Sequence, residues 1–77
     1  MAIKVRFFAS LREQVGIDER DIDCRDSATV GSIWDHVTGQ AARPTKLLAA
    51  VNLEYADLDQ RVRDGDEVAF FPPVTGG

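Results

Sequence analysis

The chain has 77 residues, a net charge of −4 at pH 7 and a hydrophobic fraction of 44%. This length suffices for one small domain with a thin core, and the hydrophobic fraction is too high for a disordered chain. The acidic balance argues against nucleic-acid binding, which rests on Lys and Arg, and favours a protein partner with a basic docking surface. No apolar run approaches the roughly 18 residues that would predict a membrane span.

Cys24 is the single cysteine of the chain, so no internal disulfide is expected. We expect a cytoplasmic protein without a signal peptide, because a strand pattern begins directly at the N-terminus. Cys24 shares a strand face with Ile22, which favours a core position over a reactive thiol. His36 has no Cys or His near it in the sequence, so no metal site is expected.

The first third of the chain predicts two strands around a short helix. Ile3 to Phe8 alternates apolar and polar residues, as a half-buried strand does. Ser10 and Glu13 have the spacing of a capping box that begins a helix, and Gly16 is suited to end it. The polar stretch from Ile17 to Arg25 is typical of an edge strand, whose charges discourage pairing with another sheet.

The main helix is predicted to follow Thr29, a favourable N-cap residue, and to end near Gly39. An apolar stripe recurs at the helical period, at Val30, Ile33, Trp34 and Val37. Trp34 is therefore expected to fill the core rather than to serve as a binding platform.

An apolar run, Leu47 to Val51, follows the main helix and predicts a central strand covered on both faces. Asn52 is suited to the turn after it. Tyr55 to Arg63 is a mixed region, either a loop or a short strand, with Leu58 and Val62 as its expected anchors in the core.

The turn signal Asp64-Gly65-Asp66 precedes a last strand, Glu67 to Phe71. The predicted order is thus strand, short helix, strand, helix, strand, irregular region and strand. We expect an α+β fold in which the first and last strands lie side by side in a mixed sheet and the main helix covers one face, the β-grasp or ubiquitin-like arrangement. Residues 1–71 would form this domain, and residues 72–77 an extended, flexible tail.

The tail reads Pro72-Pro73-Val74-Thr75-Gly76-Gly77. Its prolines have no N–H for a neighbouring strand, so the sheet should end near Phe71. Glycines allow the backbone to pass through a channel too narrow for a Cβ. The terminal carboxylate is the reactive group at the tip, so Gly77 is the candidate covalent site, modified inside another protein. The alternative is a frayed terminus without a function.

Phe8 and Phe71 should both point away from the helix-covered face, by strand alternation. One face of the sheet would then expose aromatic side chains near the root of the tail. Exposed apolar patches of this kind mark partner sites, unless a loop covers them.

These features resemble a known family. The C-terminal run from Asp64, with its ending Phe71-Pro72-Pro73-Val74-Thr75-Gly76-Gly77, closely resembles that of the small subunits of molybdopterin synthase, and the opening Ile3 to Ala9 is similar to theirs. The resemblance implies that an adenylyltransferase related to ubiquitin-activating enzymes uses ATP to adenylate the Gly77 carboxylate. A sulfur donor protein then converts the glycyl adenylate into a thiocarboxylate. No cofactor is expected on the carrier itself.

The same resemblance implies that the loaded carrier binds the molybdopterin synthase large subunit, in a heterotetramer of two large and two small subunits. The residues Pro72 to Gly76 would thread into the large subunit, which would supply the catalytic side chains. The sulfur would pass to precursor Z (cyclic pyranopterin monophosphate) to form molybdopterin. Phe8, Tyr55 and Phe71 are the expected contacts with the large subunit, and Tyr55 is chosen mainly on the resemblance.

Other functions remain open at this stage. Related ubiquitin-like sulfur carriers serve thiamine synthesis or tRNA thiolation, and ubiquitin-like modifiers form isopeptide bonds with proteins. A plain interaction domain with an inert tail is a further alternative. The stalk from Phe70 to Pro73 favours the molybdopterin branch.

Overall fold

The computed structural model describes residues 2–23, 28–39, 43 and 46–73. The predictions for Cys24 and for Val74 to Gly77 lie outside these residues. The elements, in chain order, are β1 (Ala2–Phe7), α1 (Ser10–Val15), β2 (Glu19–Asp23), α2 (Val30–Thr38), β3 (Leu48–Val51), β4 (Glu54–Ala56) and β5 (Glu67–Phe71).

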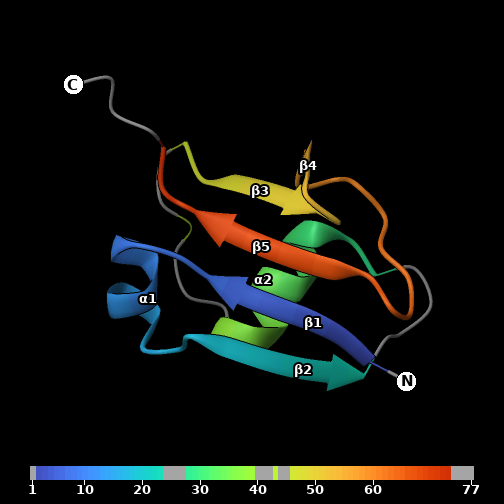
Figure 1. Cartoon of the computed structure of the whole chain (residues 1–77), viewed down its shortest axis with the longest axis horizontal. Coiled ribbons are helices and arrows are strands. Elements are labelled where there is room, and N and C mark those ends of the chain that lie inside the picture. The colour runs from blue at the N-terminus through green and yellow to red at the C-terminus, as the bar shows by residue number, and fades with distance from the viewer. Residues whose placement is uncertain (1, 24–27, 40–42, 44–45, 74–77) are drawn as a thin grey trace.

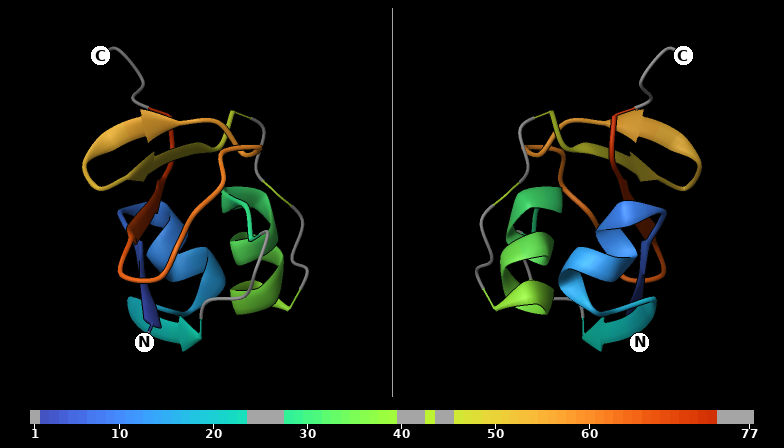
Figure 2. Two further views of the ribbon diagram at one scale, coloured as in Figure 1. Left: turned by 90° about the vertical axis from the view of Figure 1, so that its right-hand side faces the viewer. Right: turned by 90° about the vertical axis from the view of Figure 1, so that its left-hand side faces the viewer.

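The described strands form one five-stranded mixed sheet in the order β2-β1-β5-β3-β4 (Figure 1). The first and last strands, β1 and β5, run parallel and lie side by side at its centre, as predicted. β2 pairs antiparallel with β1 at one edge, and β4 pairs antiparallel with β3 at the other. Both helices lie on the same side of this curved sheet (Figure 2). The arrangement is the predicted β-grasp fold.

The core lies between α2 and the inward face of the sheet. Three aromatic rings form its centre: Phe7 stacks on Phe70 at 5.5 Å between centroids, and Trp34 meets the Phe70 ring edge-on at 5.2 Å. All three side chains are fully buried. This confirms that Trp34 fills the core, as the apolar stripe of the main helix predicts.

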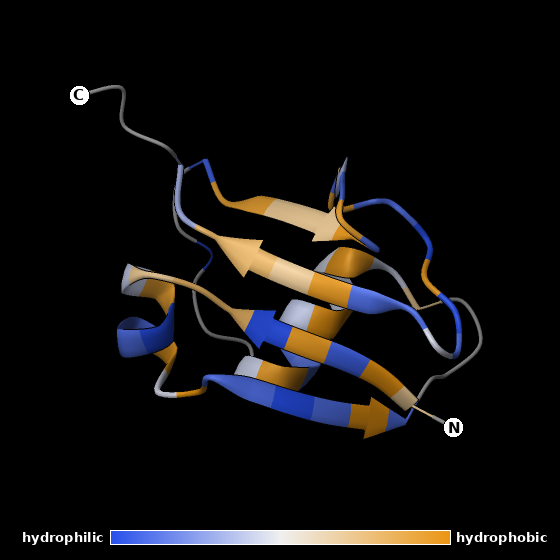
Figure 3. Ribbon diagram, viewed as in Figure 1, coloured by the Kyte–Doolittle hydropathy of each residue, from blue (hydrophilic) through white to orange (hydrophobic). Residues whose placement is uncertain are grey.

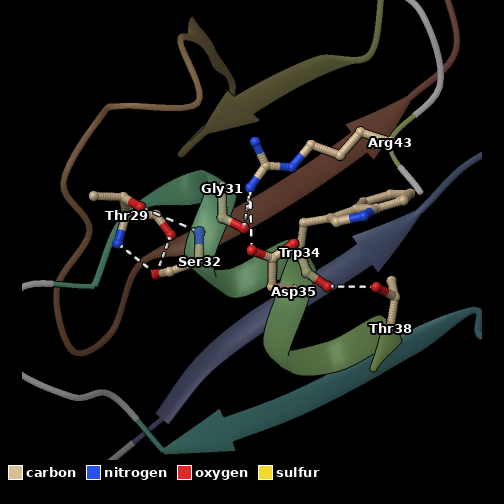
Figure 4. A network of polar contacts seen from close by, with 7 residues as sticks. All are labelled: Thr29, Gly31, Ser32, Trp34, Asp35, Thr38 and Arg43. Atoms are coloured by element: carbon tan, nitrogen blue, oxygen red, sulfur yellow. Dashed lines mark hydrogen bonds and ion pairs between the residues drawn. The ribbon is translucent and has the colours of Figure 1, made fainter. Parts of the chain in front are cut away.

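The boundaries of α2 follow directly from its capping residues. The Ser32 N–H donates to Thr29 Oγ1 at 3.1 Å, and the Thr29 N–H donates to Ser32 Oγ at 2.8 Å, a reciprocal capping box (Figure 4). Gly39 ends the helix with φ of 70°, in the left-handed region that glycine adopts without strain. The sequence-based prediction of both ends is confirmed.

A further contact secures the chain beyond α2. The guanidinium of Arg43 donates to the Gly31 carbonyl and to Asp35 Oδ2, both at 3.2 Å (Figure 4). A Cβ on Gly31 would lie 3.0 Å from Arg43 Nη2 and 3.3 Å from the Leu58 carbonyl. The absence of a side chain at Gly31 therefore lets the first turn of α2 approach the segment after β4.

The predicted capping box of α1 is wrong. Ser10 is the first helical residue, and the cap position is Ala9, with φ of 53° and no side-chain hydrogen bond. The reason is the pairing of β1 with β5: the Phe8 N–H still donates to the Phe70 carbonyl, so the chain turns sharply at Ala9. The N–H groups of the next two helical residues, Leu11 and Arg12, then donate to the carbonyls of Phe8 and Ala9.

The prediction that the strand Leu47 to Val51 is covered on both faces is also wrong. β3 begins at Leu48, and Ala49 is its one fully buried residue. β3 lies next to the edge strand β4, and the helices cover a single face of the sheet. Figure 3 shows β3 and β5 hydrophobic along most of their length, whereas β2 is almost entirely hydrophilic. The apolar run in β3 therefore reflects an apolar outer face.

Candidate functional site

The candidate site is the outer face of the sheet at the root of the C-terminal segment. The inward positions of β5 are Val68 and Phe70, both fully buried, so Ala69 and Phe71 point outward. We define the apolar patch as the outward residues of three neighbouring strands: Leu48 and Ala50 of β3, Tyr55 of β4, and Ala69 and Phe71 of β5.

Strand register places the members of the apolar patch next to one another. Ala50 lies opposite Ala69 on one side and Tyr55 on the other, and Leu48 lies opposite Phe71. Ala50 and Ala69 have small side chains, so the surface between Leu48, Tyr55 and Phe71 is lower than these larger residues. The rings of Tyr55 and Phe71 are in contact, with centroids 5.8 Å apart and planes inclined by 53°.

The two aromatic residues of the patch differ in exposure. Tyr55 is 76% exposed, and Phe71 is half-buried beneath it. Pro72 and Pro73 follow Phe71 directly and are also half-buried. β5 ends at Phe71, where the prolines predict that the sheet ends. A partner that covers the patch would therefore also contact the first residues of the tail.

Phe8 is 45% exposed but is not part of the patch. It follows β1, and it lines a separate shallow hollow with Arg6, Asp18 and Glu19. Of the three predicted contact residues, the structure thus brings Tyr55 and Phe71 into contact, whereas Phe8 follows β1, which lies on the other side of β5 from β3. Its predicted role remains a prediction.

Charged side chains border the patch on the β1 side. Arg6 Nε lies 3.1 Å from Glu19 Oε1, and Lys4 Nζ lies 3.8 Å from the same oxygen. These side chains are close to half exposed, so the pairs contribute little to stability. They give the apolar patch a polar rim, the pattern of a protein interface.

At two positions on the edge of this surface, the sequence pattern does not predict the feature that the structure shows. Leu53, in the turn between β3 and β4, is 90% exposed. Asp66 joins two turns: its Oδ2 accepts the Arg63 N–H at 2.8 Å, and its Oδ1 accepts from Asn52 Nδ2 at 3.0 Å. The Asp64-Gly65-Asp66 turn was predicted, but its contact with Asn52 depends on residues far apart in the sequence.

The hydrogen bond from the Arg63 N–H, followed by that from the Asn52 amide, lowers the pKa of Asp66 below its ordinary value of 3.8. The folded state therefore gains stability from ionised Asp66 above about pH 4, and loses it as the pH falls through the lowered pKa. Asp66→Asn should be less stable than the wild-type chain at pH 7, and this difference in unfolding free energy should shrink toward pH 3. Urea unfolding at both pH values measures it.

The side chains of Glu54, Arg61, Arg63 and Asp64 line the same polar hollow as Asp66. The wild-type chain and the Asp66→Asn variant both carry these side chains. Their titration therefore cancels to first order in the difference in unfolding free energy between the two. A difference in unfolding free energy that stays constant from pH 7 to pH 3 would contradict the assignment to Asp66.

The part of the chain that the structure describes contains no group of three or more acidic, histidine or cysteine side chains placed to hold a metal ion. Within the same residues, no helix has the length and apolar character of a membrane span.

Comparison with known proteins finds relatives that match nearly the whole chain, including this site. Residues 5–77 match the model of the ThiS family. The chain is 48% identical to the molybdopterin synthase sulfur carrier subunit of Escherichia coli, over 97% of this chain and 99% of that protein.

Solved structures agree with the fold. The crystal structure of SAMP1 from Haloferax volcanii, a small archaeal modifier protein, superposes with a TM-score of 0.80 at 29% identity, over the full length of both chains. A chain in the complex of subunits 1 and 2 of the molybdopterin-converting factor from Helicobacter pylori superposes with a TM-score of 0.63 at 21% identity, again over both full lengths. At that identity the second likeness concerns the fold alone.

Proposed function

The chain belongs to the ThiS family, and from this premise we propose that it is the sulfur carrier subunit of a molybdopterin synthase. The observation that carries the proposal is the 48% identity to the Escherichia coli subunit over nearly the whole of both chains. The family match also extends to residue 77 and so includes both terminal glycines.

The proposed chemistry takes place at the carboxylate of Gly77. A carboxylate is a poor electrophile, so an adenylyltransferase related to ubiquitin-activating enzymes first joins it to AMP, with release of pyrophosphate from ATP. A donor protein then releases sulfur at the oxidation level of sulfide, which attacks the carbonyl carbon, forms the C–S bond and expels AMP. The product is a thiocarboxylate, a better sulfur nucleophile than the original acid.

The loaded carrier then binds the large subunit of the synthase. The apolar patch, centred on Tyr55 and Phe71, is the proposed docking surface, and Phe8 is a further contact. Pro72 and Pro73 direct the tail away from the sheet. Val74, Thr75 and Gly76 then contact the walls of a channel in the large subunit, and Gly77 reaches its active site. There the sulfur passes to precursor Z and Gly77 returns to the carboxylate. The dithiolene of molybdopterin contains two sulfur atoms, so two loaded carriers are consumed for each molecule formed.

The proposal assigns the catalytic side chains to the large subunit. The carrier holds no cofactor of its own, acts in the cytoplasm and assembles as one of two small subunits with two large ones. The positioning and charge stabilisation that the reaction needs come from the enzymes that receive the tail. The folded part of the carrier acts as a recognition module.

Intact-mass spectrometry tests this function. The chain is co-expressed with the adenylyltransferase and the sulfur donor, and we expect its mass to rise by the difference between one sulfur and one oxygen atom. Incubation with the large subunit and precursor Z should return the mass to that of the free acid and yield molybdopterin. A chain whose mass stays that of the free acid under all loading conditions would contradict the proposal.

A protein modifier is the second candidate, and the likeness to SAMP1 from Haloferax volcanii supports it. A modifier would form an isopeptide bond between Gly77 and a lysine of a target protein. The same mass measurement separates the two functions, because a conjugate gains the mass of a whole protein. Carriers for thiamine synthesis or tRNA thiolation would gain sulfur but would fail to copurify with a molybdopterin synthase large subunit.

A further inference from the structure

The turn between β3 and β4 is strained and exposed. Its two central residues, Asn52 and Leu53, have φ of 52° and 72°. Asparagine tolerates this left-handed region, whereas leucine adopts it only at a cost in backbone strain. Leu53 is 90% exposed, so burial of its side chain does not offset that strain. Other contacts must hold this turn in place.

Asn52 supplies these contacts by bonding to the start of β5. Its backbone N–H donates to the Glu67 carbonyl at 2.8 Å, and its side-chain Oδ1 accepts the Glu67 N–H at 3.0 Å. The remaining side-chain group, Nδ2, donates to Asp66 Oδ1 at 3.0 Å. The amide side chain of Asn52 thus uses both its donor and its acceptor on two consecutive residues, Asp66 and Glu67, where β5 begins.

Asp66 extends this connection to the centre of the sheet. Its second carboxylate oxygen accepts the Arg63 N–H at 2.8 Å and so fixes the turn before β5. Its backbone carbonyl accepts the Lys4 N–H of β1 at 3.1 Å. We call Asn52 and Asp66 together the polar clamp, because they join the β3–β4 turn to the two central strands.

The polar clamp matters for Tyr55. β4 is three residues long, and within the described part of the chain its strand partner is β3. Tyr55 lies three residues after Asn52, and its ring rests on Phe71 of β5. The ladder with β5 holds β3 itself from Leu48 to Val51. Loss of the clamp would therefore free the turn and let β4 shift relative to β3, and the Tyr55 ring, which is largely exposed, has little other packing to hold it.

We propose that Asn52 and Asp66 are positioning residues for the docking surface: the polar clamp fixes the β3–β4 hairpin so that Tyr55 is held against Phe71 before a partner arrives. An interface that is already ordered loses less conformational entropy on binding. The choice of the large subunit as the partner rests on the proposed function, whereas the effect on Tyr55 does not.

The experiment exchanges the two side chains. In Asn52→Asp, two carboxylates face each other. In Asp66→Asn, the new amide has a single acceptor oxygen, so either the Arg63 N–H or the Asn52 amide group loses its acceptor. The double variant N52D/D66N restores every bond: the amide at position 66 donates to the carboxylate at position 52, its oxygen accepts the Arg63 N–H, and the new carboxylate accepts the Glu67 N–H.

Two measurements are made on the full chain at a temperature at which circular dichroism shows all variants folded. The first is the nuclear Overhauser effect between the rings of Tyr55 and Phe71. The second is the dissociation constant of the complex with the large subunit. We expect each single variant to weaken the ring contact and to lower the affinity about tenfold, as the loss of one charge-assisted hydrogen bond would. The double variant should return both towards wild-type values.

A merely structural clamp would give another result, in which the single variants melt at lower temperature but keep the ring contact and the affinity while folded. That outcome overturns the proposal, as does a double variant that rescues neither quantity. If the wild-type chain itself does not bind the large subunit, the proposed function fails, and the ring contact alone decides whether the clamp positions Tyr55.

Discussion

Deleting Gly77, or adding one residue after it, should abolish thiocarboxylate formation and leave the fold intact. Adenylation requires the terminal carboxylate to lie at one place in the partner's active site. One residue of extended chain spans about 3.3–3.6 Å, whereas a misplacement of about 1 Å can cost a hundredfold in rate. A shift of the carboxylate by a whole residue is therefore too large for adenylation to proceed at a useful rate.

The fold should survive because the described core lies upstream of the tail, between Ile3 and Phe70. Intact mass after co-expression with the activating enzyme measures loading, and circular dichroism measures folding. The matched control adds one alanine after Met1, which lengthens the chain equally at the other end and should load normally. Normal sulfur loading of a chain extended beyond Gly77 would refute Gly77 as the covalent site.

Replacing Phe71 with aspartate should weaken binding of the large subunit by roughly thirtyfold or more, the loss expected for an aromatic residue at the centre of an interface. Phe71 lies under Tyr55 at the root of the tail. Aspartate would remove the ring contact and place a charge where the interface excludes water. Isothermal titration calorimetry with the purified large subunit measures the change.

Three companion variants identify the cause of this loss. Phe71→Lys should weaken binding as well, because burial of either charge is unfavourable, whereas a purely electrostatic effect would reverse with the sign of the charge. Phe71→Leu should retain most of the affinity. Gln14→Glu adds one negative charge at an exposed position of α1 and should bind normally. Unchanged affinity of Phe71→Asp would exclude the apolar patch as the docking surface.

The sequence predicts most of the fold because its strongest signals are local. The stripe of apolar residues in α2 and the capping residues Thr29 and Gly39 act within one or two helical turns, and the structure confirms them. The alternation in β1 likewise identifies Ile3, Val5 and Phe7 as its buried face. Such patterns depend on the period of the element rather than on its neighbours.

The errors arise where a distant segment determines the local conformation. Ser10 has the right spacing for a cap, but the hydrogen bonding of the chain to β5 continues one residue past β1, to Phe8, and makes Ala9 the turning point. Leu48 and Ala50 look like core residues, but both helices pack on the opposite face of the sheet. A run of apolar residues does not state which of its faces another element will cover.

The sequence alone determined both helices, four of the five described strands, the core aromatic residues and the resemblance of the tail to a sulfur carrier, because each depends on neighbouring residues. It left the region of β4 open between a loop and a short strand. The tertiary structure decided that Tyr55 lies on Phe71 and that Asn52 bonds to Asp66. These residues are 14 to 16 positions apart, and they meet because β3 pairs with β5 and β4 folds back beside β3. The docking surface is therefore a product of strand order, which brings together side chains that no local pattern connects.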